Sequence, residues 1–405
     1  MLKNSEPMLF LQRSLLAALL STCYLSASHA VAADASVDPA RDMDNFGPIN
    51  NLMFWKPRER LAGFRNIDKF YPTRKIERGN KVYPLAVELE DLSGVSYEVE
   101  GKRYSTDDFM THNRVAGLLV IKNDRIVTER YELGNTETSR WISFSVAKSV
   151  VSMLAGAAIE DGYIKSVDDK VTDYIPLLKG SPYADATIRD VLRMASGTEW
   201  NEDYADRQSD VNTMPGQILN LFKVLGSKPR VAAPGEKFNY NTAETHLVGA
   251  IVRSAIGNNL ATYLTDKIWV PFGMESDATW VLHGAGGGEL GGCCINATLR
   301  DYGRIGLFAM REGVLPDGTR ILPEGWMQES TAPSKAYAGY GYLWWLGQDN
   351  FAAVGVFGQL IHVNADQKLV IATHSAWDTA GSRAYYMHRT AFVEALTAHL
   401  SGDAR

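Results

Sequence analysis

The sequence has few cysteines and lacks the usual motifs of a metal site. Its 405 residues include three cysteines, no CxxC motif and no closely spaced pair of histidines. Cys23 lies near the N-terminus, and Cys293 and Cys294 are neighbours, so a bond between those two would have to close a strained small ring. We therefore expect no disulfide framework, no metal and no cofactor, and a fold held by its hydrophobic core.

Clusters of positive charge and long apolar runs are also missing. The chain carries 41 basic and 47 acidic residues, a formal net charge of -6, and its lysines and arginines are scattered. No basic stretch can follow a phosphate backbone, which argues against nucleic acid as a partner. The apolar run Leu15 to Leu25 is too short for a helix across a bilayer of roughly 30 Å, so we expect no stable membrane span. The sequence leaves the oligomeric state open.

The N-terminus has the layout of a secretory signal. Two basic residues precede the apolar run, and small residues follow it as far as Ala33. We expect residues 1–33 to be a signal peptide cleaved after Ala30 or Ala33, which makes the mature protein periplasmic or secreted. The alternative is a lipoprotein acylated at Cys23, but Thr22 stands where Gly, Ala or Ser is usual.

The remaining chain divides into three parts by pattern. Residues 34–110 are rich in proline, charge and aromatic anchors, and we expect an N-terminal extension packed on the core. Residues 111–185 and 290–405 carry strand patterns and two helices, and predict an α/β domain. Residues 186–289 show several helical patterns with little strand signal, and predict a helical domain.

Individual elements follow from local periodicity. Val115 to Ile121 and Ile126 to Tyr131 are apolar and β-prone, and the polar residues between them predict a tight turn. After Ser145 the chain is apolar almost all round until Asp161-Gly162, which predicts a buried central helix. Strands are expected near the C-terminus, at 342–346, 351–357, 360–363 and 369–373, followed by a helix at 385–400. Two β segments far apart in sequence suggest one sheet built from both ends of the chain.

Two well-known motifs are absent or out of context. The chain has no GxSxG, which excludes the nucleophile elbow of α/β-hydrolases. Gly286 to Gly291 fits the dinucleotide spacing but follows a helical region late in the chain, where an early βαβ unit is required. A loop bordering a cleft is the better interpretation.

Ser145 and Lys148 form the pair that can carry chemistry. Three residues apart at the start of a helix, they lie on one face, so the lysine amine can approach the serine hydroxyl. The helix N-terminus favours negative charge on the serine oxygen, and burial in an apolar helix lowers the pKa of a lysine toward neutral pH. The pair therefore predicts an activated nucleophile, against the alternative of a snorkelling lysine.

Tyr240 is the tyrosine best placed to relay a proton. It directly precedes a predicted helix in which Asn241 is the expected N-cap and Glu244 the capping-box partner. A tyrosine at a helix start can pass a proton because its phenolate is stabilised there. The alternative is an aromatic residue that only packs on the helix.

Three segments together resemble the motifs of the serine β-lactamase and DD-peptidase fold family. They are Ser145-Val146-Ala147-Lys148, Phe238-Asn239-Tyr240-Asn241-Thr242 and Gly355-Val356-Phe357-Gly358-Gln359. Phrases such as Phe70 to Arg74 and Asn201 to Tyr204 are similar to the 6-aminohexanoate-oligomer hydrolases and related esterases. The resemblance implies an α/β (α+β) class with a β-lactamase/transpeptidase-like fold, in which helices flank an antiparallel sheet and a helical domain is inserted.

The resemblance also implies residue roles. Ser145 is expected to be the nucleophile, Lys148 its base and Tyr240 the proton shuttle. The oxyanion hole would be the backbone N–H groups of Ser145 and, by its position on the strand, Val356. Tyr204 matches a substrate-contacting tyrosine, with packing of a loop aromatic as the alternative, and Gly358 is a further candidate for substrate binding.

Departures from the family pattern narrow the substrate. Thr242 stands where penicillin-directed members have Asn, and Phe351 to Phe357 contains no cation to recognise a substrate carboxylate. An acidic residue that binds the amino group of the nylon dimer is replaced near Met214-Pro215. The expected function is therefore an exported serine hydrolase of small esters or amides. The alternatives are a penicillin-recognising peptidase or β-lactamase, and a catalytically silent binding protein.

Overall fold

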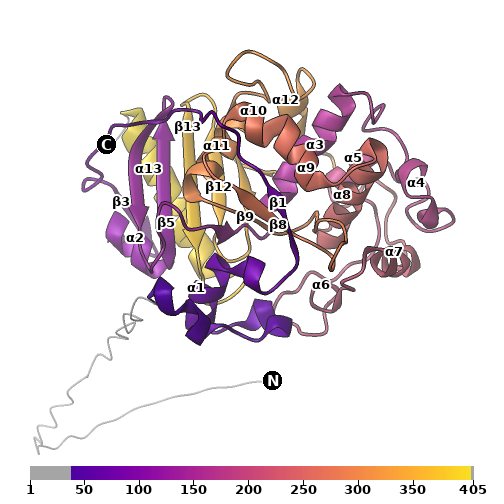
Figure 1. Ribbon diagram of the computed structural model, residues 1–405, viewed down its shortest axis with the longest axis horizontal. Coiled ribbons are helices and arrows are strands. Elements are labelled where there is room, and N and C mark those ends of the chain that lie inside the picture. Colours follow the sequence, from indigo (N-terminus) through magenta and orange to yellow (C-terminus); the bar gives the residue numbers. More distant parts are fainter. Residues whose placement is uncertain (1–37, 403–405) are drawn as a thin grey trace, which may run out of the picture. The chain divides into compact units, whose positions relative to one another are not determined.

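The computed structural model describes residues 38–402, whose main element is a seven-stranded sheet of order β10-β11-β12-β13-β5-β6-β2 (Figure 1). Its strands are β2 (Ala86–Val87), β5 (Val115–Lys122), β6 (Arg125–Tyr131), β10 (Trp345–Leu346), β11 (Phe351–Val354), β12 (Leu360–Asn364) and β13 (Leu369–Ser375). Neighbours are antiparallel except for β2 and β6, which are parallel. Val120 lies opposite Ile371, so the sheet built from both ends of the chain is confirmed.

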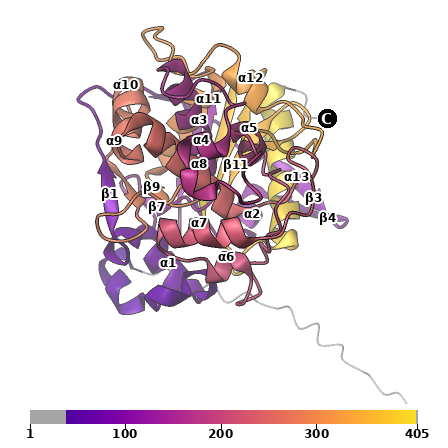
Figure 2. The same ribbon diagram turned by 90° about the vertical axis from the view of Figure 1, so that its right-hand side faces the viewer.

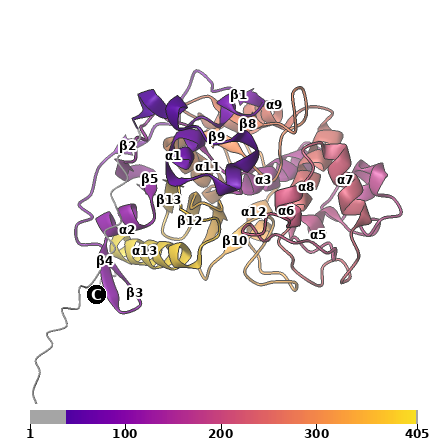
Figure 3. The same ribbon diagram turned by 90° about the horizontal axis from the view of Figure 1, so that it is seen from below.

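The two faces of this sheet bury different helices (Figure 3). Leu118 and Val120 point to the face covered by α2 (Thr106–His112) and α13 (Arg383–Ser401). Leu119 and Ile121 point to the opposite face, toward α11 (Leu299–Met310) and α3 (Val146–Glu160). Alternation along a strand sends successive side chains to opposite faces, and here both faces are buried because both carry helices. The expected α/β class, an antiparallel sheet flanked by helices, is confirmed.

A second, four-stranded sheet has the order β1-β8-β9-β7. Its strands are β1 (Thr73–Ile76), β7 (Trp141–Ile142), β8 (Ala278–Val281) and β9 (Ile295–Ala297). A hairpin of β3 (Ser96–Val99) and β4 (Lys102–Ser105) forms the third sheet. The second sheet positions the site, because β7 ends three residues before Ser145.

Helices gather beside α3 in the segment 171–272 (Figure 2). They are α4 (Val171–Tyr174), the 3-10 helix η4 (Pro176–Leu178), α5 (Ile188–Leu192), α6 (Asp210–Thr213), α7 (Ile218–Ser227), α8 (Thr242–Ile256), α9 (Leu260–Leu264), the π-helical turn η5 (Thr265–Trp269) and α10 (Val270–Phe272). Val150 and Leu154 of α3 share one core with Leu247 and Ile251 of α8. Within the described residues 38–402, the α/β part and the helical part therefore belong to one compact unit.

The N-terminal segment adds elements of its own to the main body. It contains the 3-10 helices η1 (Pro39–Asn45), η2 (Ile49–Phe54) and η3 (Ile67–Lys69) and the helix α1 (Pro57–Arg65). It also supplies β1 to the second sheet and β2 to the main sheet. The predicted signal peptide 1–33 and Cys23 lie outside the described residues. Between residues 38 and 402, no helix is both long and apolar enough to cross a membrane.

Most predicted elements exist, with differences at their ends. The strand expected at 342–346 is only Trp345–Leu346, and the one expected at 351–357 ends at Val354. Residues after Val354 turn instead, because Gly358 has a φ of 95° and its N–H bonds back to the Gly355 carbonyl. Val356 therefore lies in the turn between β11 and β12, and its expected position on the strand was wrong.

Candidate active site

Ser145 lies at a sharp bend between β7 and α3. It is the N-cap residue of α3, and the preceding Phe144 has a φ of 44°, in the left-handed region. Ser143 fixes the bend by bonding to Ile295 twice: its N–H donates to the carbonyl at 2.8 Å, and its Oγ accepts from the N–H at 2.9 Å. The hydroxyl of Ser145 is thereby held at the positive end of the apolar helix α3.

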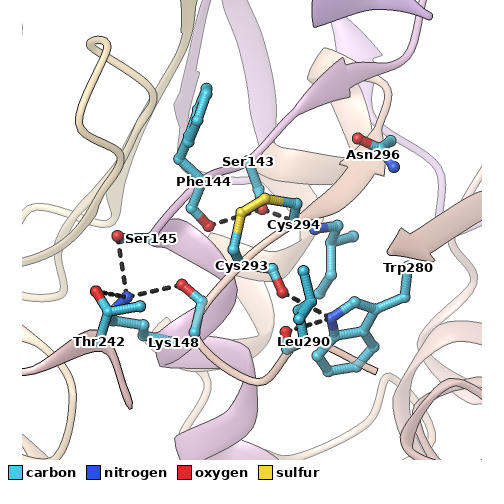
Figure 4. The surroundings of a disulfide bond; sticks show 12 residues. Ser143, Phe144, Ser145, Lys148, Thr242, Trp280, Leu290, Cys293, Cys294 and Asn296 are labelled. Atoms are coloured by element: carbon cyan, nitrogen blue, oxygen red, sulfur yellow. Dashed lines mark hydrogen bonds between the residues drawn. A yellow bond between two sulfur atoms is a disulfide. The ribbon is translucent and has the colours of Figure 1, made fainter. Parts of the chain in front are cut away.

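Lys148 is buried one turn into α3, with its amine directed at Ser145 (Figure 4). Its Nζ donates to Ser145 Oγ at 3.1 Å, to Thr242 Oγ1 at 3.1 Å and to the Gly292 carbonyl at 2.7 Å. The side chain is 1% exposed, and this burial lowers the pKa of Lys148 to about 8, while the carboxylate of Glu202 acts in the opposite direction. A large fraction of the amine is therefore neutral near pH 8.

Tyr240 lies on the other side of the serine, two residues before α8. Lys148 Nζ lies 5.5 Å from the centre of its ring, and the neighbouring Ser145 hydroxyl acts to lower the pKa of its phenol. The ring stacks on Trp345 at 5.6 Å between centroids. Burial raises the pKa of Tyr240, so the phenol keeps its proton at neutral pH. The structure thus brings Ser145, Lys148 and Tyr240 together.

The start of α8 agrees only partly with the sequence. Asn241 is the N-cap as predicted, and its side chain accepts from the Glu244 N–H. The side chain of Glu244 does not complete a capping box, and instead accepts from Ser196 and from Tyr183, the latter at 3.1 Å. The expected capping-box partner was wrong because this glutamate is drawn into a buried polar cluster.

Glu202 is a component of the site to which sequence reasoning gave no role. One of its oxygens accepts from the hydroxyls of Thr242 and Tyr204, the latter at 2.6 Å. The other accepts from the Thr242 N–H at 3.0 Å and from the Trp200 indole. The phrase Asn201 to Tyr204 was noted as a family resemblance, but nothing in the local pattern indicates that its glutamate reaches the start of α8.

A cavity of about 380 Å³ opens beside Ser145. Tyr204 and Val356 line it, and so do Leu290 and Gly292, which supports the interpretation of the glycine-rich segment as a loop at the edge of a cleft. Most of the other lining side chains are apolar: Leu52, Met53, Ile67, Val211, Met214 and Leu282. No Lys, Arg, Asp or Glu is among the described residues that line it. The two lining histidines, His246 and His283, have pKa values lowered by burial.

The predicted oxyanion-hole groups lie at this cavity, and Gly358 does not. Ser145 and Val356 both line it, and within residues 38–402 neither backbone N–H has a hydrogen-bond acceptor. Gly358 sits behind them in the β11–β12 turn, where a Cβ would lie 2.3 Å from the Trp377 ring. A glycine is needed at position 358 because the backbone has a positive φ and packs closely on the Trp377 ring.

The loop that contacts Lys148 contains a disulfide between neighbours (Figure 4). Cys293 and Cys294 are bonded across a cis peptide, with their Cα atoms 3.3 Å apart. The small ring that the sequence argued against is therefore present, and it is not a disulfide framework. Trp280 anchors the loop by donating to the carbonyls of Leu290 at 2.9 Å and Cys293 at 3.0 Å. The bond joins no distant segments.

Comparison with known proteins places this geometry in a family. The family model described as Beta-lactamase matches residues 105–394. The chain is 26% identical over 365 residues to the 6-aminohexanoate-dimer hydrolase of Paenarthrobacter ureafaciens, which covers 82% of this chain and 88% of that protein.

Solved structures share the fold at lower identity. A protein of Bacillus anthracis, named putative 6-aminohexanoate-dimer hydrolase, superposes with a TM-score of 0.77 at 21% identity, covering 86% of this chain and 96% of its own. A penicillin binding protein of Bacillus halodurans gives a TM-score of 0.58 at 18% identity, covering 71% of this chain and 98% of its own.

Proposed function

The chain belongs to the β-lactamase family and is a hydrolase, and from that premise we propose that it cleaves a small ester or amide through an acyl-enzyme on Ser145. The observation that carries the proposal is the 3.1 Å contact between the buried amine of Lys148 and the hydroxyl of Ser145. A nucleophile within hydrogen-bond reach of a base with a lowered pKa is the arrangement that covalent catalysis requires.

In the proposed reaction, neutral Lys148 takes the proton of Ser145 as the serine oxygen attacks the substrate carbonyl carbon. The oxyanion is stabilised by the backbone N–H groups of Ser145 and Val356. Tyr240 gives its proton to the departing oxygen or nitrogen and regains one from the Lys148 ammonium, so the serine proton leaves with the product. Water then attacks the ester on Ser145, and the same groups act in reverse.

The cavity favours an uncharged, apolar acyl group. Its described lining has no ion to pair with a substrate carboxylate or ammonium, and a volume of about 380 Å³ is at the small end of ligand pockets. Burying a charged group against such walls without a partner would be costly. Met214 and Pro215, where the sequence indicated loss of an acidic residue, belong to this apolar wall.

The direct test is labelling of Ser145. We expect a fluorophosphonate to modify Ser145 stoichiometrically, and p-nitrophenyl butyrate to give turnover with an acyl group on the same residue by peptide mass spectrometry. Ser145→Ala should abolish both, with Ser149→Ala on the same helix as the matched control. Absence of label and of turnover in correctly folded wild-type protein would refute the proposal.

Penicillin recognition is the competing function, and the absence of a Lys or Arg among the described residues that line the cavity argues against it. We expect no saturable labelling by a fluorescent penicillin at micromolar concentration. Such labelling, lost in Ser145→Ala, would assign the site to β-lactams instead.

We also propose that the protein is exported, on the basis of the pattern in residues 1–33. The expected result is a mature chain that begins at Val31 or Asp34 in the periplasmic or culture fraction, as read by N-terminal sequencing. An acylated chain that begins at Cys23 would show a lipoprotein, and a full-length chain retained with the cytoplasm would contradict export.

A further inference from the structure

A chain of hydrogen bonds runs from Glu202 through Thr242 to Lys148, and the reaction described above does not use its first two members. The Thr242 hydroxyl donates to Glu202 Oε1, and Lys148 Nζ lies 3.1 Å from the same hydroxyl oxygen. Thr242 is the first residue of α8, and its backbone N–H also bonds to Glu202, at 3.0 Å. The carboxylate of Glu202 thus accepts hydrogen bonds from both the side-chain hydroxyl and the backbone N–H of Thr242.

The direction of these bonds is decided by counting protons. A threonine hydroxyl has one proton, and a carboxylate can only accept, so the Thr242 proton is committed to Glu202. Toward Lys148, the Thr242 oxygen can then act only as an acceptor. The Gly292 carbonyl, at 2.7 Å from Nζ, is an acceptor by nature.

A neutral lysine amine has two N–H bonds and one lone pair. If Thr242 and Gly292 each take one N–H, the lone pair is left for the third neighbour, the hydroxyl of Ser145 at 3.1 Å. If the Thr242 hydroxyl were free to rotate, its proton could bond to the same lone pair and withdraw the base from the serine. An acceptor fixed at this position therefore decides whether the neutral amine faces Ser145.

Resting on the proposed function, we propose that Glu202 is a positioning residue: it makes the Thr242 hydroxyl a permanent acceptor and so directs the lone pair of neutral Lys148 at Ser145. This assigns a role to the threonine that stands where penicillin-directed relatives have asparagine. An asparagine side chain has its own carbonyl acceptor, whereas a threonine needs a partner to fix its proton.

The surroundings are built to keep this geometry. A Cβ on Gly292 would lie 2.8 Å from the Thr242 methyl and 2.9 Å from its carbonyl, so glycine is required for the loop to approach α8. Tyr204 and the Trp200 indole complete the hydrogen bonds of Glu202. These bonds hold the carboxylate in one orientation, and within residues 38–402 it forms no ion pair with a Lys or Arg that would compete for it.

The electrostatic surroundings of Lys148 give the proposal a measurable signature. The titratable groups that face its amine are Glu202, Tyr240 and His246, with Tyr204 behind Glu202. Burial raises the pKa values of the tyrosines and lowers that of His246, so all three are neutral near pH 7. Glu202 raises the pKa of Lys148, and removal of its charge should lower that pKa.

The experiment compares four variants by pre-steady-state acylation with p-nitrophenyl butyrate from pH 5.5 to 9.5. Glu202→Gln should lower the plateau rate about 10- to 100-fold, because small errors of position are costly in such steps, and should move the acid limb to lower pH. Thr242→Val should lower the plateau by a similar factor, and Thr242→Ser should restore it to within a few fold. Glu199→Gln removes an exposed carboxylate from the same loop and should behave as wild type.

A second measurement does not depend on turnover. Titration of the Lys148 ¹³Cε shift in specifically labelled protein should give a lower pKa in Glu202→Gln than in wild type, while thermal unfolding verifies that both are folded. Plateau rates of Glu202→Gln and Thr242→Val within twofold of wild type, or an unmoved Lys148 titration, would overturn the positioning role. Failure of wild type to acylate Ser145 would be a different result, because it would refute the proposed hydrolase itself.

Discussion

Phe144 is the residue whose backbone makes the site possible. A bulky residue with a φ of 44° is costly, on the order of 1–3 kcal/mol, and persists only where neighbours enforce it. Here the Phe144 ring packs against Phe64 at 5.1 Å and Phe357 at 5.0 Å between centroids. The packing of a side chain thus stabilises the bend that presents the proposed nucleophile.

Substitutions of the two proton carriers test the proposed roles. Lys148→Met keeps the length of the side chain without its base, and we expect acylation to fall by about 10²- to 10⁴-fold, the usual contribution of proton transfer. We expect Tyr240→Phe to lower the acylation rate by a factor in the same range. Single-turnover release of p-nitrophenol measures the acylation rate of both variants. A rate for Tyr240→Phe near that of wild type would mean that another group transfers the proton.

The pH dependence of the wild type follows from Lys148. Protonated lysine has no lone pair, so the rate should rise with pH through the pKa of about 8 and level off above it. Two pH units below that value, acylation should be roughly one hundredth of the plateau. Profiles of kcat/KM for an uncharged ester measure this, and a flat profile from pH 6 to 9 would contradict a lysine base.

Sequence could predict part of this site, and the reason lies in how the residues are placed. Ser145 and Lys148 are neighbours on one helix turn, and Tyr240 stands beside a recognisable helix start, so local pattern together with the family resemblance predicted that they meet; their catalytic roles stay a prediction. Gly292 reaches Lys148, and Glu202 reaches Thr242, from loops whose paths are set by tertiary packing. No periodic pattern encodes such contacts.

At the scale of elements, α8 connects the site to the stability of the fold. Its first residue, Thr242, bonds to Lys148, and Glu244, two residues further, is buried among hydroxyl groups. Burial raises the pKa of Glu244 to about 8, although hydrogen bonds from Ser196, Tyr183 and Thr198 partly offset the effect. The helix that contacts the proposed base thus also contains a glutamate whose titration changes the stability of the fold.

That titration predicts how stability changes with pH. An unfolded glutamate has a pKa near 4.5, so between about pH 4.5 and 8 the folded state binds more protons than the unfolded state. The free energy of unfolding should therefore decrease as pH rises through this range, by at most about 1.4 kcal/mol per pH unit from this group.

Glu244→Gln should remove this dependence and be more stable than wild type at pH 8, as measured by urea unfolding. The control is Glu394→Gln, an exposed glutamate on α13. Identical slopes against pH for wild type and Glu244→Gln would show that Glu244 titrates normally.

Elements with strong periodicity were predicted well, and short strands were not. β5, β6, β13 and α3 each have enough residues for a pattern to appear. β2 and β7 have two residues each and exist only because a partner strand lies beside them. Pairing between distant segments defines such strands, so single-sequence reasoning has little to detect.

At the scale of the whole molecule, the cavity depends on chain outside the matched family region. Leu52, Met53, Ile67 and Tyr71 line it, yet the family match begins at residue 105. The N-terminal segment therefore lines the cavity beside Ser145 as well as adding strands to the two sheets.

Shortening a side chain of this N-terminal part of the cavity lining should change the preference for the length of the substrate acyl chain. The groups around Ser145 should be unaffected. We expect Met53→Ala to lower kcat/KM for p-nitrophenyl hexanoate about 3- to 10-fold, the effect of one or two buried methylenes, and to change the acetate ester little. Leu89→Ala, an exposed residue of the same N-terminal segment, is the control. Equal losses of kcat/KM on both esters would indicate that the substitution disturbs the fold and not the contact with the acyl chain.

The pairing of β5 with β13 also sets how much of the chain is needed before the main sheet can form. β5 covers Val115–Lys122, but its partner on this edge is Leu369–Ser375, on the far side of the helical segment. Until the two strands pair, one edge of β5 is open, and its apolar residues can associate with other chains. A chain truncated before Leu369 therefore has no strand that joins β5 to β12, so α3 lacks part of the sheet on which it packs and Ser145 loses the support that holds it in place.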